Sequence, residues 1–209
     1  MIYNRHNQIT RKVMKRALDL VVALPAVVLL FPLMLVTALA IRLMDGHSAL
    51  FVQKRPGLHG KPFRMYKFRT MRQFTSPEGV PLPDEQRVTR LGVILRETSL
   101  DELPSLFNVI KGEMSLVGPR PLLMEYLPNY TPFENRRHEV KPGVTGWAQV
   151  NGRNEISWKE KFRYDVWYAD HGSFWLDLKI LGSTVVQVLM RKGNKGSAFV
   201  SRYTEVEKS

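Results

Sequence analysis

Hydrophobic residues are most concentrated in one early segment of this chain. Residues 20–41 read LVVALPAVVLLFPLMLVTALAI and carry no charge over 22 positions. A straight helix of this length would measure about 33 Å, close to the roughly 30 Å hydrocarbon core of a bilayer. Pro25 and Pro32 lie inside the segment, and each removes a backbone donor, which predicts a kink or break. The pattern predicts a membrane helix that is interrupted near Pro32 and Pro25.

Basic residues flank this segment on both sides. They include Arg11, Lys15 and Arg16 before it, and Arg42 and Lys54 after it. The positive-inside rule places such flanks on the cytoplasmic side, so the segment would enter and leave the membrane by one face, as a re-entrant helix. A spanning helix remains the alternative, because proline also occurs in ordinary spans. A signal peptide fits less well, since its apolar region is usually about 7–15 residues long; we therefore expect a retained anchor.

The pattern changes after the apolar segment. Residues 49–53 and 63–68 are short, partly alternating runs separated by the turn residues of 54–62, which predicts a β-hairpin. Residues 73–86 are polar and contain three prolines, as in a loop.

From Val88 onward the pattern is mainly helical. The Ser157-x-x-Glu160 capping box predicts the start of a helix that ends near Gly172. Residues 176–189 fit a second amphipathic helix, which could lie on a membrane surface or pack in a core. We expect an α+β fold: a mainly helical single catalytic domain (45–192) with a small β-hairpin, an N-terminal re-entrant or spanning membrane helix (1–44) and a loose tail (193–209).

Composition narrows the choice of function. The chain has 209 residues, with 31 Lys and Arg against 19 Asp and Glu, for a net charge of +12. Residues 1–72 hold 13 of the basic residues and only two acids, so the body behind them is nearly neutral. A uniformly basic nucleic-acid coat would not show this asymmetry. The absence of cysteine excludes disulfides, thiolate catalysis and cysteine zinc sites, and a mean hydropathy of −0.20 excludes a multi-span membrane protein.

The most informative polar stretch is Arg96–Pro104. Pro104 fits best in the first turn of a helix, which places Asp101 and Glu102 near a helix N-terminus, where unpaired amides stabilise ionised carboxylates. Such an aspartate could bind Mg²⁺ or act as a nucleophile. The alternative is structural, because Ser99-x-x-Glu102 is itself a capping box.

Two further features point to anionic ligands. Arg120 lies between Pro119 and Pro121, and arginine suits bidentate contact with phosphate. Residues 141–153 are rich in glycine and polar groups, as in a loop that approaches a ligand backbone, or in a hairpin. Carboxylates, arginines and a membrane anchor together suggest phosphoryl chemistry on a membrane-held substrate.

At this point a family resemblance becomes specific, because several motifs occur in a fixed order. They are Lys15-Arg16 before Asp19, Arg55-Pro56-Gly57, Lys67-Phe68-Arg69-Thr70-Met71, Ser99-Leu100-Asp101-Glu102-Leu103, Leu106-Phe107-Asn108-Val109, Gly118-Pro119-Arg120-Pro121 and the Lys141–Arg153 run. The chain resembles the bacterial sugar transferases, in particular the small monotopic phosphoglycosyl transferases, from about Lys15 to Gly193.

The resemblance implies transfer of a sugar phosphate from a UDP-sugar to undecaprenyl phosphate, with release of UMP, at the start of surface polysaccharide or glycoconjugate synthesis. It implies that Asp101 is the nucleophile, forms a covalent phospho-sugar intermediate and helps to hold Mg²⁺. It also makes Glu102 the dyad partner and a candidate base. Residues near the substrate phosphates would be Arg96, Lys67, Arg120, Arg153 and, less directly, Asp177.

The same resemblance implies a location on the cytoplasmic side of the bacterial inner membrane, contact with membrane lipid and no nucleic-acid partner. It leaves the sugar, the pathway and the oligomeric state open, including a homodimer. One departure concerns the anchor: the family breaks its helix at a Ser-Pro pair, and the aligned pair here is Phe31-Pro32. The functional alternative is a non-catalytic scaffold that binds anionic lipid through its basic front.

Overall fold

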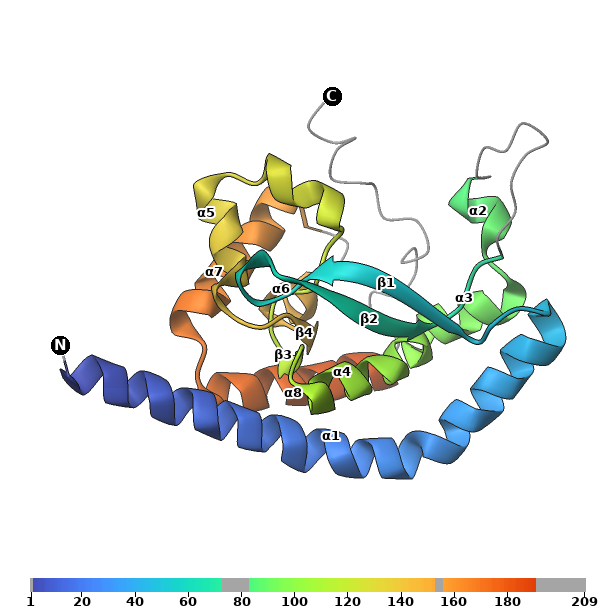
Figure 1. Cartoon of the computed structure of the whole chain (residues 1–209), viewed down its shortest axis with the longest axis horizontal. Helices are drawn as coiled ribbons and strands as arrows, with labels where there is room; N and C mark the ends of the chain where they lie inside the picture. The colour runs from blue at the N-terminus through green and yellow to red at the C-terminus, as the bar shows by residue number, and fades with distance from the viewer. Residues whose placement is uncertain (1, 73–82, 153–155, 191–209) are drawn as a thin grey trace.

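The computed structural model describes residues 2–72, 83–152 and 156–190. The described chain is mainly helical, with one antiparallel hairpin and one short parallel strand pair (Figure 1). The elements in chain order are α1 (Ile2–Asp45), β1 (Leu50–Pro56), η1 (Leu58–Gly60), β2 (Pro62–Phe68), α2 (Asp84–Arg87), α3 (Arg90–Glu97), η2 (Leu100–Ser105), α4 (Leu106–Lys111), β3 (Ser115–Val117), η3 (Met124–Asn129), α5 (Pro132–Asn135), η4 (Arg136–Glu139), β4 (Gly143–Thr145), α6 (Trp147–Val150), α7 (Trp158–His171) and α8 (Phe174–Leu189), where η marks 3₁₀ turns. This confirms the predicted α+β class.

Helix α1 is continuous through both of its prolines. Of the predicted kink or break, the break is wrong, whereas the kink agrees with the structure, because the helix bends in its middle as it follows one side of the body (Figure 1). A proline costs a helix one hydrogen bond and pushes one carbonyl aside, which a bend can accommodate without ending the helix.

Both halves of α1 pack against the same body. Asp19 and Ala23 are buried in the first half, and Met34 and Ile41 in the second. Ala23 joins the core cluster of Val109, whereas Met34 and Ile41 pack with Phe68 and Leu95. Many other apolar side chains of the helix are exposed, among them Val21, Leu24, Val28, Leu29, Phe31, Leu35, Val36, Leu39 and Leu43.

Polar side chains fasten the first half of α1 to the body. Lys15 Nζ donates to Asp177 Oδ2 at 2.7 Å and to Tyr168 Oη at 2.9 Å. Arg16 donates from both Nη atoms to the carbonyls of Val109 and Ile110, each at 2.6 Å, where the last carbonyls of α4 need partners. We call the group formed by Lys15, Arg16, Asp19, Ser115, Tyr168 and Asp177 the anchor latch.

Asp19 completes the anchor latch at a fully buried position. Its Oδ1 accepts hydrogen bonds from Ser115 Oγ at 2.8 Å and from the Leu116 amide at 2.9 Å. A buried carboxylate with two donors keeps its charge satisfied, so this contact ties α1 to strand β3.

The hairpin follows directly after α1 and confirms the sequence prediction. Strands β1 and β2 pair in an antiparallel register in which Phe51 is opposite Lys67 and Arg55 is opposite Phe63. The face that carries Phe63 and Met65 is buried, and apart from its pairing with β1, strand β2 packs most extensively on η2. The hairpin therefore presents one face to the segment that carries Asp101 and Glu102.

Helices α7 and α8 form the other side of the body. The predicted capping box is confirmed, since Ser157 Oγ accepts from the Glu160 amide at 3.2 Å and Glu160 Oε2 accepts from the Ser157 amide at 3.0 Å. Helix α7 ends at His171, before Gly172, as expected. The predicted polar loop over 73–86 contains the short helix α2, while its residues 73–82 and the predicted tail 193–209 lie outside the described residues.

Candidate active site

The segment that carries the two carboxylates is a 3₁₀ turn rather than an α-helix. Ser99 precedes η2 with φ 59° and ψ 15°, in the left-handed region, and its side chain makes no capping hydrogen bond. The capping-box alternative is therefore wrong, because an N-cap serine needs an extended backbone to aim its oxygen at the following amides. Glu102 is released from a capping role and turns to basic side chains instead.

Glu102 is the best-paired group of the site. Its Oε1 accepts from Lys67 Nζ at 2.8 Å and from Arg120 Nη2 at 2.5 Å, and Arg120 Nη1 lies 3.3 Å from Oε2. Burial opposes its ionisation, but the charges and hydrogen bonds of Arg120 and Lys67 outweigh burial and hold the pKa of Glu102 well below its usual value. The same burial lowers the pKa of Lys67, against the opposing charge of Glu102.

Asp101 differs sharply from its neighbour. Among the residues that the structure describes, none donates a hydrogen bond to its carboxylate. Burial and the adjacent charge of Glu102 raise the pKa of Asp101 to about 6, against the opposing charges of Lys67, Arg120 and Arg96. Asp101 does lie in the first turn of a helix, as predicted, but burial and the charge of Glu102 outweigh the groups that favour its ionised form. Asp101 is a half-buried carboxylate whose oxygens are available to a ligand.

Arg96 reaches the site from the last turn of α3. Its Nε donates to Thr70 Oγ1 at 3.0 Å, and its charge acts on Asp101. Gly92 permits this approach, because a Cβ at that position would lie 2.1 Å from the Thr70 carbonyl oxygen. Helix α3 thus lies directly against the end of the hairpin and brings Arg96 to the carboxylates.

The backbone of Arg120 is fixed by a hydrogen bond from a buried arginine, Arg137. Arg137 Nη2 donates to the Arg120 carbonyl at 2.7 Å and to Asp165 Oδ2 at 2.6 Å, and Arg137 Nε also donates to Asp165 at 3.0 Å. Both partners of this ion pair are almost fully buried. Sequence reasoning missed Arg137 and Asp165, because nothing in an Arg-Arg-His run or in one helical aspartate indicates their pairing.

The glycine-rich run has a structural explanation. A Cβ at Gly143 would lie 2.1 Å from the Gly118 amide nitrogen, and one at Gly146 would lie 2.2 Å from the Gly118 carbonyl oxygen. Strand β4 pairs in parallel with β3, so the hairpin alternative is wrong. Gly143 and Gly146 therefore allow a close approach to the backbone at Gly118, whereas Gly152 lies against the Ile156 side chain.

Of the five predicted substrate-site residues, the structure brings three together with the carboxylate pair, places Asp177 elsewhere and does not describe Arg153. Lys67, Arg96 and Arg120 surround Asp101 and Glu102. Asp177 belongs to the anchor latch, where it is 2% exposed and bound to Lys15 and Tyr168, and it contacts neither carboxylate of the pair. Arg153 lies outside the described residues.

The site offers limited but suitable ligands for Mg²⁺. Within the described ranges, no group of three or more His, Asp or Glu side chains forms a metal cage. Mg²⁺ is commonly held by one or two carboxylates together with substrate phosphates and water. The unpaired carboxylate of Asp101 fits that arrangement, whereas both oxygens of Glu102 are already used by cations.

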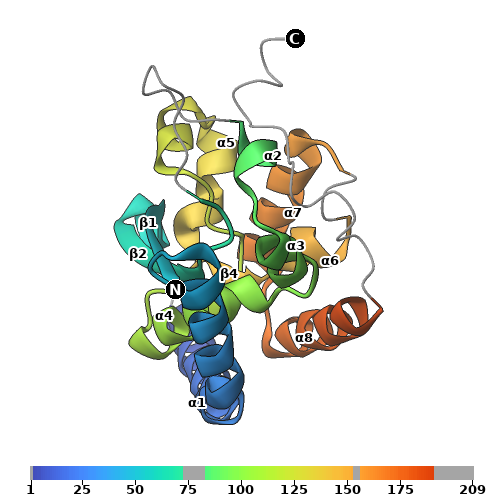
Figure 2. The same ribbon diagram turned by 90° about the vertical axis from the view of Figure 1, so that its right-hand side faces the viewer.

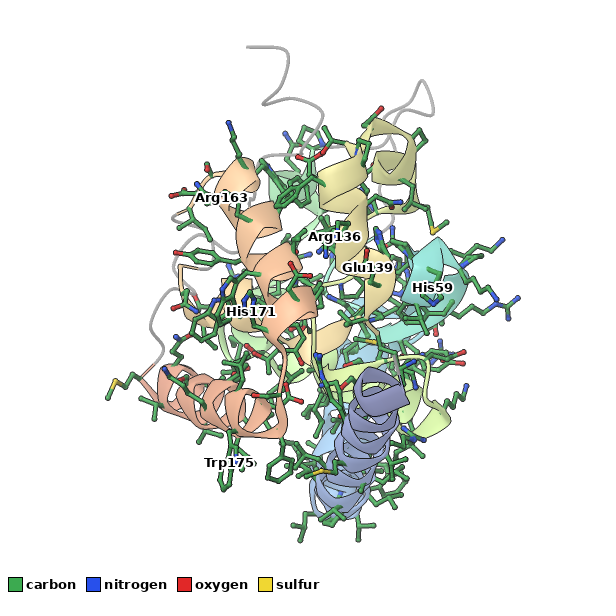
Figure 3. All side chains as sticks on the ribbon, turned by 90° about the vertical axis from the view of Figure 1, so that its left-hand side faces the viewer. His59, Arg136, Glu139, Arg163, His171 and Trp175 are labelled. Atoms are coloured by element: carbon green, nitrogen blue, oxygen red, sulfur yellow. The ribbon has the colours of Figure 1, made fainter. Side chains whose placement is uncertain are left out.

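Apolar side chains of α1 and α8 share one side of the molecule. The helical stretch Arg11–Met44 is long and apolar enough to cross a membrane, and its most apolar 18-residue window has a mean hydropathy of 2.7. Figure 2 shows α8 beside α1 along the same side of the body, and Figure 3 shows Trp175 projecting there. Trp175 is 76% exposed, while Ile180 is buried. Helix α8 therefore packs in the core through one face, as one alternative predicted, and exposes apolar side chains on its other face.

Comparison with known proteins places this site in a family. A family profile described as "Bacterial sugar transferase" matches residues 10–191. The chain is 56% identical over 181 residues to an uncharacterized sugar transferase, EpsL, of Bacillus subtilis, covering 87% of this chain and 90% of that protein.

Other relatives carry more specific names. A UDP-glucose:undecaprenyl-phosphate glucose-1-phosphate transferase of Xanthomonas campestris is 42% identical over 86% of this chain. A UDP-N-acetylgalactosamine-undecaprenyl-phosphate N-acetylgalactosaminephosphotransferase of Aeromonas hydrophila is 39% identical over 84% of it. The matched regions cover only 40% and 43% of those two proteins. With nearly its whole described length matched, the chain belongs to the bacterial sugar transferase family.

Proposed function

We propose that this protein transfers a sugar phosphate from a UDP-sugar to undecaprenyl phosphate at the cytoplasmic face of the bacterial inner membrane and releases UMP. The observation that carries the proposal is the carboxylate pair, in which Asp101 is unpaired and Glu102 is fixed between Lys67 and Arg120. Relatives whose names state this chemistry support it. The membrane helix α1, packed on the same body, supports a lipid-linked acceptor.

The unpaired carboxylate suits a two-step displacement. In the first step an Asp101 oxygen forms a bond to the β-phosphorus, and the bond from this phosphorus to the bridging oxygen breaks, so that UMP leaves with the electron pair. In the second step a phosphate oxygen of undecaprenyl phosphate attacks the same phosphorus and releases Asp101. Splitting the reaction lets one nucleophile serve two bulky phosphate substrates in turn.

The basic residues stabilise the charge that gathers on the transferred phosphoryl group. Lys67 and Arg120 are held in place by Glu102, and Arg96 faces Asp101. Mg²⁺, held by Asp101 with the substrate phosphates, would add charge neutralisation when bound. Glu102 is so strongly paired that it is a weak base, and we propose that it orients the two cations instead of accepting a proton.

The packing of α1 supports a re-entrant anchor. Asp19 and Ile41 lie in opposite halves of the helix, and both are buried against one body. A helix that spans a bilayer would carry one end about 30 Å from the other side, away from that body. We propose that α1 dips into one leaflet and returns, with the exposed apolar side of α8 resting on the same surface.

The central experiment measures UMP release. Purified protein in detergent is supplied with Mg²⁺, undecaprenyl phosphate and, in turn, UDP-linked diacetamido sugars, N-acetylhexosamines and hexoses. The wild type should release UMP with at least one donor, and Asp101→Asn should lower the rate at least ~10³-fold, as expected for loss of a nucleophile. Asp170→Asn, an exposed aspartate on α7, serves as the control and should keep wild-type activity.

Two outcomes would contradict the proposal. Normal turnover in Asp101→Asn would remove Asp101 from the nucleophile role. Salt-sensitive binding to anionic vesicles, with no UMP release from any donor, would favour the lipid-binding scaffold.

Topology has a separate test, which the lack of native cysteine makes simple. Cysteines placed at Tyr3 and at His47 are labelled in intact cells and in inverted vesicles with an impermeant thiol reagent. A re-entrant α1 predicts that both sites react only from the cytoplasmic side. Labelling of the two sites from opposite sides would show a spanning helix.

A further inference from the structure

Arg55 lies near the end of β1, on the hairpin face that looks toward the carboxylates. In the antiparallel register Arg55 is opposite Phe63 and Phe51 is opposite Lys67. Because side chains alternate along a strand and opposed residues share a face, Arg55 and Lys67 lie on one face. At about 3.3 Å per residue they are separated by about 13 Å along the hairpin.

The guanidinium of Arg55 is only partly satisfied. Nη2 donates to Gln53 Oε1 at 2.7 Å, and Nη1 lies 3.4 Å from the Pro121 carbonyl. Nε is buried and has no hydrogen-bond partner. Among the described residues no carboxylate lies within ion-pair distance of it.

Its electrostatic surroundings are also unfavourable. Burial and the charge of Arg120 lower the pKa of Arg55 to about 10, and the more weakly acting groups Tyr126, Glu102 and Glu125 only partly offset them. A buried guanidinium beside another guanidinium is costly unless an anion joins them. Since Glu102 already serves Lys67 and Arg120, the missing anion has to come from a ligand.

We propose that Arg55 binds a phosphate group of the substrate, together with Arg120, and that this phosphate belongs to the diphosphate of the nucleotide sugar. The assignment rests on the proposed function. Arginine in a rigid strand suits bidentate phosphate contact, and the charges of Arg55 and Arg120 interact, so the two long side chains are near enough to bind one phosphate between them.

The position of Arg55 favours the nucleotide sugar over the lipid phosphate. Strand β1 begins at Leu50, soon after the end of α1 at Asp45. Arg55 is five residues further, about 16 Å along the strand. A lipid phosphate has to remain near the membrane surface, whereas a soluble nucleotide can occupy the far end of the hairpin.

The test compares ligand binding by four proteins: the wild type, Arg55→Gln, Arg55→Lys and the control Lys54→Gln. Lys54 is the adjacent exposed cation, on the opposite face of the hairpin. The probes are UDP and farnesyl phosphate, a short polyprenyl phosphate, each titrated calorimetrically into protein in detergent. Loss of a charged hydrogen-bonding group should weaken UDP binding about 10- to 100-fold in Arg55→Gln, with farnesyl phosphate binding and the Lys54→Gln control unchanged.

Each contrary outcome has a separate meaning. UDP binding equal to the wild type in Arg55→Gln overturns the proposal, and loss of farnesyl phosphate binding alone assigns Arg55 to the lipid phosphate and overturns it as well. If Arg55→Gln does not fold, Arg55→Lys decides: it keeps the charge without the planar fork, so weaker UDP binding supports the proposal and unchanged binding overturns it. A wild type that binds no UDP would instead refute the proposed function.

Discussion

Two groups of charged side chains in this protein are built in opposite ways. In the anchor latch, Lys15 is paired with Asp177 and Tyr168, and Asp19 accepts two hydrogen bonds. At the candidate active site, Asp101 accepts none from the described residues, and the Nε of Arg55 has no partner.

The difference separates structure from chemistry. A buried polar network in which each member has a partner fixes the position of the parts that it joins, which suits the attachment of a membrane helix. A buried group without a partner costs stability, and such groups persist where a ligand completes them. In this fold, charged side chains that lack a partner therefore indicate the substrate site better than charged side chains in general.

The largest expected effect concerns the ion pair between Arg137 and Asp165, which is fully paired like the anchor latch but supports the backbone of the candidate active site. Arg137→Met leaves Asp165 buried and unpaired, so the free energy of unfolding should fall by about 3–5 kcal/mol in denaturant titrations. The double variant Arg137→Met/Asp165→Leu removes both charges and should recover most of that loss. UMP release should remain about 10-fold low in the double variant, because the carbonyl of Arg120 still lacks its donor.

Arg136 provides the control for this experiment. It is partly exposed and pairs with Glu139 and Asp170, so Arg136→Met should change neither stability nor activity appreciably. A double variant as unstable as Arg137→Met would show that the pair acts through packing and not through an uncompensated charge.

The next effect concerns the anchor latch itself. Lys15→Met strands the carboxylate of Asp177, whose side chain is 3% exposed, and should cost about 2–3 kcal/mol, less than a fully buried pair because Lys15 is partly hydrated. Lys12 is exposed on the same helix, and Lys12→Met is the matched control. Thermal unfolding in detergent measures both variants, and equal midpoints would mean that the latch does not stabilise the fold.

Much of this arrangement could be predicted from the sequence, where the signal was local. Hydropathy located α1, alternation located the hairpin, and the Ser157–Glu160 capping box located the start of α7. Motif resemblance named Asp101, Glu102, Lys67, Arg96 and Arg120, which the structure gathers at one site.

The remainder depends on contacts between residues far apart in sequence. Arg137 with Asp165 and Lys15 with Asp177 are ordinary polar residues until folding joins them. The wrong prediction of a capping box at Ser99 has a different cause. The local sequence fits a cap, but the backbone of Ser99 is left-handed. Glu102 binds Lys67 and Arg120 instead of the Ser99 amide.

A smaller effect concerns Asp101, where substitution should stabilise the protein, whereas substitution of a buried residue usually destabilises it. Burial and Glu102 raise the pKa of Asp101 to about 6 from its ordinary value near 3.8, so the folded state binds the proton more tightly and wild-type stability falls as pH rises from about 4 to 6. Asp101→Asn removes this penalty and should raise the free energy of unfolding by about 1–2 kcal/mol at pH 8. The gain should shrink toward pH 4, where the carboxyl is protonated in both states. A gain that does not depend on pH would point to packing, and a loss at pH 8 would contradict the unpaired state of Asp101.

The smallest effect measures how strongly the two carboxylates depend on Arg120. The charge of Arg120 directly opposes the rise in the Asp101 pKa, and Arg120 together with Lys67 keeps Glu102, the second cause of that rise, ionised. In Arg120→Gln the opposing charge is lost while Lys67 still pairs with Glu102, so the pKa of Asp101 should rise further above its value of about 6. Carbon-13 NMR of aspartate-labelled, metal-free protein follows this titration, with Arg136→Gln as a control that should leave it unchanged. An Asp101 pKa that stays in place would mean that Lys67 and Arg96 alone balance the pair. Arg120 would then be a paired residue like those of the anchor latch, and its one difference would be that its exposed side chain can exchange Glu102 for a substrate phosphate.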